Sequence, residues 1–462
     1  MLRLFNHYFP SSAVYQVLID VLVLFGGILL AAFYVSGEVV SGLTAVVPSA
    51  LVFAVVMVAL SSALGLYGSR RDPSFRDMLA RVLLTVLFSV PVAWAVFRLL
   101  PWGKAFATLD ATVIMLLGGV LLARGVSRRA TTSTMWRRRI LVIGTGREAA
   151  SVEYSLTHPH HPGLDVVGFL PVPGFEESLV QPSRVLQPAA DKTLLDVARS
   201  LEVDEIIVAV RERRGGTLPL SELLDCKLMG IKVLDLSCFF ERVRGQVRLD
   251  SLRASWLIYG EGFRQGNLRT MVKRAFDVSA ALLLLTLTAP IMLLTMIAIA
   301  IEDGFPVLYK QERVGQGGRT FKVIKFRSMY RDAEKDGKPR WASANDNRVT
   351  RIGRLIRKTR IDELPQLFNV LMGDMSMVGP RPERPFFVDQ LTSEIPFYAV
   401  RHSVKPGVTG WAQVRYQYGA SVDDAVQKLQ YDLYYVKNHT LFLDIMVLAE
   451  TVRVVLTGEG AH

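Results

Sequence analysis

Four long apolar stretches occupy the first 135 residues of the chain. They lie at residues 14–35, 45–67, 79–100 and 108–123. Each is about long enough to cross a hydrocarbon layer of roughly 30 Å as a helix. Half of the whole sequence is hydrophobic, which is a high fraction for a soluble protein. We therefore predict a bundle of four transmembrane helices over residues 1–135.

The distribution of lysine and arginine around these stretches predicts the side of the membrane on which each end lies. No lysine or arginine separates the first stretch from the second, whereas Arg70, Arg71 and Arg76 follow the second and a further arginine cluster follows the fourth. Positively charged loops favour the cytoplasmic side of a membrane. Both ends of the bundle, and the chain after residue 135, are therefore predicted to lie in the cytoplasm.

Residues 136–265 change character, because short β-branched runs now alternate with helical patterns. Such alternation is typical of a parallel α/β domain. The segment Gly144-Thr145-Gly146 opens a Gly-x-Gly-x-x-Ala pattern that resembles the fingerprint of a dinucleotide site. The acidic residue that would bind the ribose after the second strand is missing, since that strand runs into Pro171. We interpret this part as a Rossmann-like module with a structural or regulatory role.

Residues 266–462 begin with an apolar run at 278–301 that Pro290 interrupts. The run is long enough to span a bilayer. However, Lys273 and Arg274 precede it and further cations follow it, so both flanks favour the cytoplasm. Proline removes an internal hydrogen bond and bends a helix. We predict a re-entrant helix that enters the membrane, bends at Pro290 and returns to the same side; a kinked spanning helix is the alternative.

Two adjacent carboxylates, Asp362 and Glu363, follow a strongly cationic segment. Phosphate-bearing substrates suit such a field, and a carboxylate inside it can stay ionised, act as a nucleophile or hold a divalent metal. An amphipathic helix with a solvated charged face would give the same pattern. Pro365 predicts that a helix over residues 366–372 begins just after the pair. The cations before Asp362 are Arg348, Arg351, Arg354, Arg357, Lys358 and Arg360.

Further cations lie in motifs that could bind an anionic substrate. Pro380 and Pro382 restrict the backbone around Arg381, so that its guanidinium fork is presented from a stiff segment. Lys325 and Arg327 belong to an alternating basic stretch, which predicts a strand after a glycine-rich turn. No nucleic-acid-binding motif accompanies the net charge of +12, so phosphorylated ligands and anionic lipid are the expected partners.

The motifs of residues 266–462, in their order, resemble the catalytic domain of the monotopic phosphoglycosyl transferases, the bacterial polyprenyl-phosphate sugar-1-phosphate transferases. The predicted transmembrane helices and Rossmann-like module resemble the large-form members that initiate exopolysaccharide synthesis. One departure is Ala289, because the family often has serine before the bending proline, and a shallower bend is expected without it. The matching stretches are 273–277, the apolar run with Pro290, 325–329, 362–367, 379–382 and 405–413.

The resemblance implies a reaction and a set of site residues. Asp362 would attack the sugar-bearing phosphate of a UDP-hexose, release UMP and carry the phosphosugar until undecaprenyl phosphate accepts it. Glu363 would assist, and Asp362 would also be a ligand of Mg²⁺. A multi-pass protein of the bacterial inner membrane, in contact with its lipids and forming a homodimer, is expected. The substrate-binding residues would be Arg381, Pro380, Pro382, Arg360, Lys325, Arg327, Lys273 and Arg274.

Two other functions remain open at this point. The glycine turn could serve a membrane-anchored NAD-dependent sugar-nucleotide epimerase or dehydratase, although no Tyr-x-x-x-Lys pair follows it in the α/β segment. The chain could also be a non-catalytic, nucleotide-sensing scaffold of polysaccharide export, in which Asp362, Glu363 and Arg381 would have no chemical task. The sequence does not distinguish glucose from galactose as the hexose.

Overall fold

The computed structural model falls into two compact units, which we describe separately. The first comprises Met1–Leu4 and Tyr8–Val243, and the second comprises Phe5–His7 and Arg244–His462. The residues that the structure describes are 2–4, 7–9, 11–36, 41–63, 85, 87–89, 137–157, 164–172, 178–187, 192–210, 218–249, 266–331, 333, 348–416, 419 and 421–457.

Two long helices follow the short strands β1 (Leu2–Leu4) and β2 (His7–Phe9). Helices α1 (Ser11–Ser36) and α2 (Ser41–Ala63) overlap the first two apolar stretches and pack against each other. The third and fourth stretches lie outside the described residues, apart from residues 85 and 87–89, which are helical. The four-helix bundle therefore stays a prediction.

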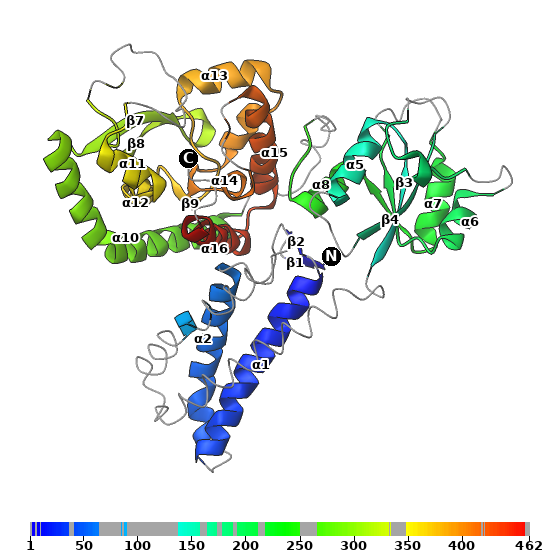
Figure 1. Cartoon of the computed structure of the whole chain (residues 1–462), viewed down its shortest axis with the longest axis horizontal. Coiled ribbons are helices and arrows are strands. Elements are labelled where there is room, and N and C mark those ends of the chain that lie inside the picture. Colours follow the sequence, from blue (N-terminus) through cyan, green and yellow to red (C-terminus); the bar gives the residue numbers. More distant parts are fainter. Residues whose placement is uncertain are drawn as a thin grey trace. The chain divides into compact units, whose positions relative to one another are not determined.

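The described residues from 137 to 244 contain a parallel sheet with the strand order β4-β3-β5-β6 (Figure 1). This confirms the parallel α/β arrangement, whereas the role of the module stays a prediction. Helices cover both faces of the sheet, because α6 and α7 share one apolar core with it and α5 and α8 share another. The elements are β3 (Arg138–Ile143), α5 (Arg147–Thr157), β4 (Leu164–Leu170), η3 (Pro182–Arg184), α6 (Leu194–Ser200), β5 (Glu205–Val208), α7 (Leu220–Leu228), β6 (Lys232–Asp235) and α8 (Leu236–Arg244).

The glycine turn after β3 has a packing reason of its own. Gly144 has a φ of 116°, a conformation that glycine adopts readily and other residues do not. A Cβ atom at this position would lie 2.5 Å from the carbonyl oxygen of Ala209. The backbone of Leu179 also covers the turn, donating to the carbonyl of Thr145 at 2.8 Å. The glycine is therefore accounted for without a bound nucleotide.

The second unit is a mixed α/β structure around one large apolar core. Strand β8 confirms the predicted strand after the glycine-rich turn and pairs with β7 as an antiparallel hairpin, whereas β9 pairs in parallel with β10. The elements are α10 (Asn267–Asp303), β7 (Leu308–Val314), η4 (Gln316–Gly318), β8 (Thr320–Phe326), α11 (Arg351–Lys358), η5 (Ile361–Glu363), α12 (Gln366–Met372), β9 (Ser376–Val378), α13 (Pro385–Glu394), η6 (Tyr398–Ser403), β10 (Gly407–Thr409), α14 (Trp411–Arg415), α15 (Val422–Asn438) and α16 (Leu441–Thr457).

Helix α10 is continuous and longer than the apolar run at 278–301 from which it was predicted. Its 37 residues would extend about 55 Å if the helix were straight. Figure 1 instead shows α10 changing direction along its length, and Pro290 lies in its interior. Proline cannot donate the hydrogen bond that a helix position requires, and its ring clashes with the preceding turn. The bend thus has its cause in the sequence.

Both ends of α10 are attached to the rest of the second unit. Near the first end, the Asp277 carboxylate accepts a hydrogen bond from the backbone N–H of Met377 at 3.2 Å. Near the other end, the Glu302 carboxylate accepts from the N–H groups of Arg351 and Ile352 at 2.8 and 3.0 Å. Glu302 thereby satisfies free donors at the start of α11. The apolar middle of α10 is held between two polar attachments to one folded body.

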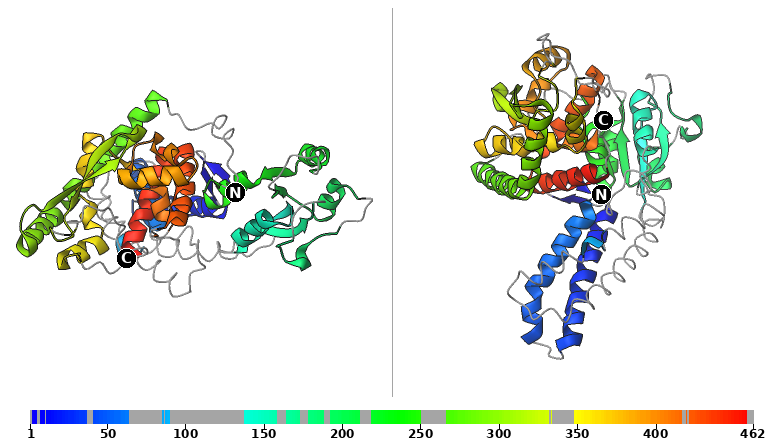
Figure 2. Two further views of the ribbon diagram at one scale, coloured as in Figure 1. Left: turned by 90° about the horizontal axis from the view of Figure 1, so that it is seen from above. Right: turned by 60° about the vertical axis from the view of Figure 1, so that its left-hand side comes forward.

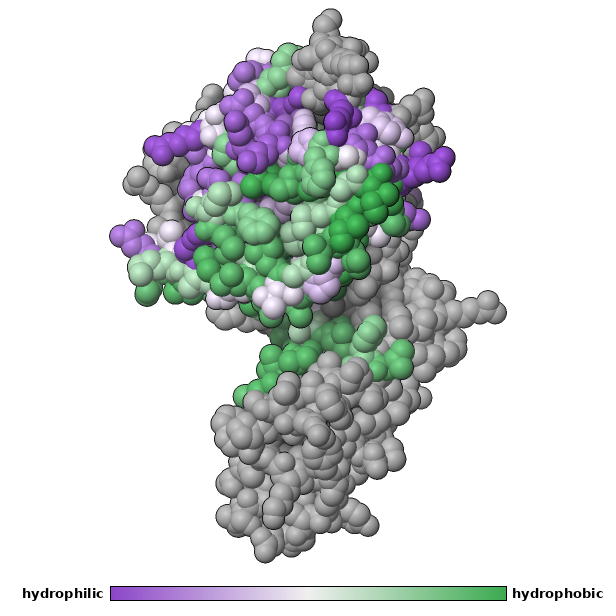
Figure 3. Space-filling view, turned by 90° about the vertical axis from the view of Figure 1, so that its left-hand side faces the viewer, coloured by the Kyte–Doolittle hydropathy of each residue, from purple (hydrophilic) through white to green (hydrophobic). Residues whose placement is uncertain are grey.

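The outer surface of α10 is apolar, and Figure 3 shows it as a region of hydrophobic side chains. Helix α10 is long and apolar enough to cross a membrane, and only 17% of its most apolar segment is buried. A core helix would be mostly buried, so this surface indicates contact with a membrane. The exposed side chains are Leu268, Met271, Val272, Leu282, Leu283, Leu287, Ile291, Leu293, Leu294, Ile297 and Ile301.

Helix α16 lies beside α10 in both Figure 1 and Figure 2. An ion pair of 3.1 Å joins Lys273 Nζ on α10 to Asp444 Oδ2 on α16. Leu443 and Val447 of α16 enter the apolar core, whereas Ile445 is exposed. The helix therefore contributes to the core on one face and adds apolar surface next to α10 on another.

The side chain of Asn369 takes the place of a neighbouring strand for β8. Its Nδ2 donates to the carbonyl of Lys322 at 2.9 Å, and its Oδ1 accepts from the N–H of Ile324 at 3.0 Å. Asn369 lies on α12 and is fully buried. One amide thus satisfies both a donor and an acceptor on the edge of β8 that does not face β7. This contact fixes β8 against the helix that follows the carboxylate pair.

We predict that Asn369→Leu destabilises the second unit by roughly 2–4 kcal/mol, because a buried N–H and a buried C=O lose their partners. The neighbouring Phe368→Leu is the control, since Phe368 is exposed on the same helix. Thermal unfolding of the purified protein in detergent measures both. Equal melting temperatures for the two variants would contradict a structural role of the amide.

Candidate active site

The two carboxylates lie in η5, a short 3-10 turn between α11 and α12. Thr350 caps the start of α11 by accepting a hydrogen bond from the N–H of Gly353 at 2.8 Å. Helix α11 ends at Lys358 with Thr359 as its C-cap, and Arg360 then adopts a left-handed conformation with a φ of 56°. Such a conformation is uncommon for a residue other than glycine. It reverses the chain, and Asp362 and Glu363 follow directly.

Of the two adjacent carboxylates, Glu363 is the one that forms ion pairs. Its Oε1 accepts from Arg381 at 2.7 Å and from Lys325 at 3.1 Å, and its Oε2 lies 4.0 Å from Arg360. Three of the predicted substrate-binding cations therefore gather around one buried carboxylate. Burial alone would raise the pKa of Glu363, but these cations lower it far below its usual range. Glu363 consequently carries a permanent negative charge.

Asp362 has a different environment. Among the residues that the structure describes, none makes a hydrogen bond or ion pair with its carboxylate. Burial raises the pKa of Asp362 to about 6 and the Glu363 charge adds to the rise, whereas Lys325, Arg381 and Arg357 oppose it. The carboxylate is thus poised to ionise near neutral pH and keeps its oxygen lone pairs available. A carboxylate of this kind can attack an electrophile or bind a metal.

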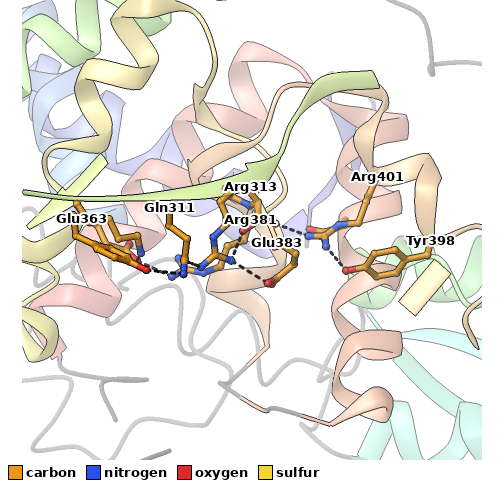
Figure 4. Close-up of polar contacts among 11 residues, drawn as sticks. Gln311, Arg313, Glu363, Arg381, Glu383, Tyr398 and Arg401 are labelled. Carbon is orange, nitrogen blue, oxygen red and sulfur yellow. Dashed lines mark hydrogen bonds and ion pairs between the residues drawn. The ribbon is translucent and has the colours of Figure 1, made fainter. Parts of the chain in front are cut away.

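Arg381 reaches Glu363 from residues 379–383, which we call the strap. Figure 4 shows the polar contacts around the strap, which extend from Glu363 through Arg381 and Arg313 to Arg401 and Tyr398. The strap crosses β10 so closely that a Cβ atom at Gly379 would lie 2.3 Å from the carbonyl oxygen of Lys405. The motifs at 379–382 and 405–413 therefore form one packed unit.

The prolines of the strap agree with the predicted stiff presentation of Arg381. Pro380 accepts a hydrogen bond from the N–H of Gly407 at 3.0 Å, and Pro382 accepts one from Arg313 Nη1 at 3.1 Å. Neither proline can donate, and the ring of each fixes one backbone dihedral. Pro380 and Pro382 thus act through the backbone that carries Arg381.

Three predicted substrate-binding cations have other partners. Lys273 is bonded to Asp277, Ser376 and Asp444. Arg274 donates to the last carbonyl groups of α12 at Val370 and Leu371. Arg327 donates to the carbonyls of Asp303, Gly304 and Pro306 after α10. The described contacts of these residues hold α10 in place, and none of them reaches Asp362 or Glu363.

The described residues contain no group of three or more His, Cys, Asp or Glu side chains placed to hold a metal. Mg²⁺ commonly binds through one or two carboxylates together with substrate phosphates and water. The contacts of Glu363 are taken up by cations, whereas Asp362 is unpaired among the described residues. The donor set therefore fits a metal that binds together with a diphosphate through Asp362.

Sequence reasoning missed several residues that shape the site, namely Asn369, Arg313, Glu383, Arg401 and Asp432. Asp432 gives a signal, because it is a single acid within an apolar and aromatic stretch, and a buried charge requires a partner. The sequence pattern does not say which cation that partner is. Arg313 and Glu383 look like ordinary surface charges until β7 is placed beside the strap.

Comparison with known proteins shows the family to which the chain belongs. Residues 268–458 match the family described as bacterial sugar transferase. A Caulobacter vibrioides protein named UDP-glucose:undecaprenyl-phosphate glucose-1-phosphate transferase is 44% identical over 41% of this chain and 72% of its own length. A Xanthomonas campestris protein of the same name is 30% identical over 76% of this chain and 73% of its own length. The chain belongs to the bacterial sugar transferase family, which confirms the resemblance to polyprenyl-phosphate hexose-1-phosphate transferases.

A third relative matches over a smaller share of its length. It is the Aeromonas hydrophila UDP-N-acetylgalactosamine-undecaprenyl-phosphate N-acetylgalactosaminephosphotransferase, 45% identical over 52% of this chain. The match spans 56% of that relative. The relatives therefore differ both in the sugar that their names give and in how much of their length is shared.

We predict that Asp362 titrates near pH 6 in the metal-free protein, because its raised pKa reflects burial and the Glu363 charge. Above that pH it is ionised and below it is protonated, while Glu363 stays ionised. Lys325→Met should move the Asp362 transition to higher pH, since it removes a cation that lowers this pKa. Infrared titration of protein with carbon-13-labelled aspartate, minus the same titration of Asp362→Asn, measures the transition.

Lys322→Met is the matched control for that titration, because Lys322 is an exposed lysine on the same strand. It should leave the Asp362 transition unchanged. A transition of the wild-type protein near pH 4, the ordinary range of an aspartate, would contradict the electrostatic description of the pair.

Proposed function

We propose that this protein transfers a hexose-1-phosphate from a UDP-hexose to undecaprenyl phosphate, giving undecaprenyl-diphospho-hexose and UMP. The observation that carries the proposal is the contrast within the carboxylate pair. Glu363 is fixed by Lys325 and Arg381, while Asp362 is half-buried beside the same cations without a partner among the described residues. Such a carboxylate suits attack on a phosphate, and the named activities of the relatives favour this reaction class.

In the first step, an Asp362 carboxylate oxygen attacks the sugar-bearing phosphorus of the UDP-hexose. A bond forms between that oxygen and phosphorus, and the bond from phosphorus to the bridging oxygen breaks. UMP leaves with the bridging oxygen and the electron pair of the broken bond. The product is an acyl phosphate that joins Asp362 to the phosphosugar. Arg381 and Lys325 favour this step, because cations beside the phosphate stabilise its negative charge.

In the second step, a phosphate oxygen of undecaprenyl phosphate attacks the same phosphorus. The bond between phosphorus and Asp362 breaks, and its electron pair restores the carboxylate. Neither step requires a net proton transfer, so a permanently charged Glu363 is compatible with the sequence of events. Glu363 acts by holding the side chains of Lys325 and Arg381 in position. Mg²⁺, bound through Asp362 and the diphosphate, would supply further charge neutralisation.

The membrane arrangement that we propose for this reaction is re-entrant. Both ends of α10 are attached to one folded unit, and the exposed middle of the helix is apolar. If that unit faces the cytoplasm, as the charge distribution predicts, both ends of α10 lie there. The lipid phosphate of the acceptor is then available at the headgroup plane. The proposal includes a homodimer, with glucose or galactose as the hexose.

We predict that Asp362→Asn lowers UMP release by at least about 10³-fold, because the neutral amide cannot replace the nucleophile. Without acceptor, radiolabelled sugar from the UDP-hexose should stay on the wild-type protein and not on the variant. Asp389→Asn is the control, since Asp389 is exposed on α13. An equal amount of label on Asp362→Asn and Asp389→Asn would contradict the covalent step. If the wild-type protein released no UMP from any UDP-hexose, the proposed reaction itself would be wrong.

We predict that both flanks of α10 lie on the same side of the membrane. Single cysteines at the exposed positions Arg269 and Lys310, in a protein without Cys226 and Cys238, should both resist an impermeant thiol reagent in intact cells and react after permeabilisation. A cysteine at Ser41, which the charge rule puts on the opposite side, is the control that should react in intact cells. If only one of the two variants, Arg269→Cys or Lys310→Cys, were labelled in intact cells, α10 would be a spanning helix.

A further inference from the structure

Arg401 lies under the strap and is held by three partners. Its Nη2 donates to the backbone carbonyl of Arg381 at 2.8 Å and lies 2.8 Å from Asp432 Oδ2. Its Nη1 donates to the hydroxyl of Tyr398 at 2.6 Å. Figure 4 shows Arg401 and Tyr398 at the end of the polar contacts that begin at Glu363. Arg401 comes from η6 and Asp432 from α15, so the strap is attached to two further elements.

The backbone of the strap is fixed almost completely by hydrogen bonds. Most of its anchors are backbone groups of β7 and β10, which any sequence could supply. Arg401 is different, because it is a buried side chain that binds the carbonyl of Arg381 itself. The anchors are Gly379 N to Thr409 O at 2.9 Å, Gly407 N to Pro380 O at 3.0 Å, Arg401 Nη2 to Arg381 O, Arg313 Nη1 to Pro382 O at 3.1 Å, and Val314 N to Glu383 O at 2.9 Å.

The contact at the Arg381 carbonyl restrains the backbone from which the Arg381 side chain extends. Peptide planarity joins this carbonyl rigidly to the nitrogen of Pro382, whose ring fixes the next dihedral. Rotation of this peptide plane within the anchored strap would require the backbone at Arg381 to shift, and such a shift would carry its guanidinium away from Glu363. The contact of Arg401 opposes that rotation.

The burial of Arg401 and Asp432 is difficult to explain by stability alone. Arg401 is 6% exposed and Asp432 is 2% exposed. A buried ion pair is often no more stabilising than an apolar pair of similar volume, because both charges lose their hydration. Burial also raises the pKa of Asp432 to about 6, although Arg401 opposes the rise. The pair is better explained by the geometry that it imposes.

We propose that Arg401, held in place by Asp432 and Tyr398, is a positioning residue that aims Arg381 at Glu363 and the donor phosphates. This inference rests on the proposed function, since it assigns Arg401 a task in that reaction. Arg401 contacts neither Asp362 nor Glu363. It acts only through the backbone of Arg381, so its effect should vanish when the Arg381 guanidinium is absent.

The experiment is a mutant cycle on UMP release from a UDP-hexose, with kcat and KM measured separately. Arg401→Met/Asp432→Leu removes both charges together, which avoids an uncompensated buried ion. We expect kcat/KM to fall about 100-fold, the scale of a misplacement of about 1 Å, with the same division between kcat and KM as in Arg381→Lys. In a protein that already carries Arg381→Lys, the same double replacement should lower kcat/KM by a further factor of less than about three.

Arg401→Lys covers the case in which the double replacement does not fold. Lysine keeps the charge for Asp432 but lacks the planar fork that serves Asp432 and the Arg381 carbonyl at once. It should fold, as judged by thermal unfolding and gel filtration, and still lose activity with the kcat and KM division of Arg381→Lys. Arg242→Met/Glu205→Leu is the matched control, because it removes a buried arginine–carboxylate pair in the first unit. Its activity should equal that of the wild-type protein.

Two results would overturn the inference. The losses of kcat/KM from the Arg401 and Arg381 replacements could multiply in the combined variant, which would mean that Arg401 does not act through Arg381. A folded Arg401→Lys protein with wild-type kcat and KM would show that the carbonyl contact is dispensable. Failure of the proposed function looks different, because the wild-type protein itself would then release no UMP.

Discussion

The ion pairs of Glu363 with Lys325 and Arg381 are the interaction on which the site depends. They join β8, η5 and the strap, which are separated in the sequence but meet at one buried carboxylate. The same pairs keep Glu363 charged, and that charge helps to raise the pKa of Asp362. A single set of contacts therefore both assembles the site and makes two adjacent acids chemically different.

The supporting framework holds these cations through the backbone more than through the side chains near them. Asn369 fixes β8, which carries Lys325, and Arg401 together with β10 fixes the strap, which carries Arg381. Glycine at 379 allows the strap and β10 to approach closely, and the flanking prolines remove alternative conformations. The geometry of the site thus depends on residues that touch no substrate.

Local motifs predicted much of this arrangement. The partners that lie far apart in the sequence could not be predicted. The α/β alternation, the strand after the glycine-rich turn and the start of α12 after Pro365 follow from patterns a few residues long. The meeting of Lys325, Arg360 and Arg381 at Glu363 does not follow from such patterns, because these residues are separated in the sequence. Lys273, Arg274 and Arg327 were expected to bind substrate because they are cations in the matching motifs, but most of the groups that they bind in the structure lie 20 or more residues away along the chain. Asn369, Arg401 and Asp432 were missed for the same reason, since a pattern of residues shows that a buried polar group needs a partner without showing which one.

The attachments of α10 have a consequence for how the chain enters the membrane. Met377 follows Asp277 by 100 residues, and Arg351 follows Glu302 by 49 residues. The ribosome therefore delivers the apolar helix well before it delivers the groups that hold either end. Until synthesis has passed β9, nothing in the second unit prevents the helix from being threaded straight through the bilayer as an ordinary anchor. In the proposed re-entrant arrangement, the bend at Pro290 and the cations on both flanks would therefore direct the helix during synthesis, and the folded unit would afterwards hold its two ends together.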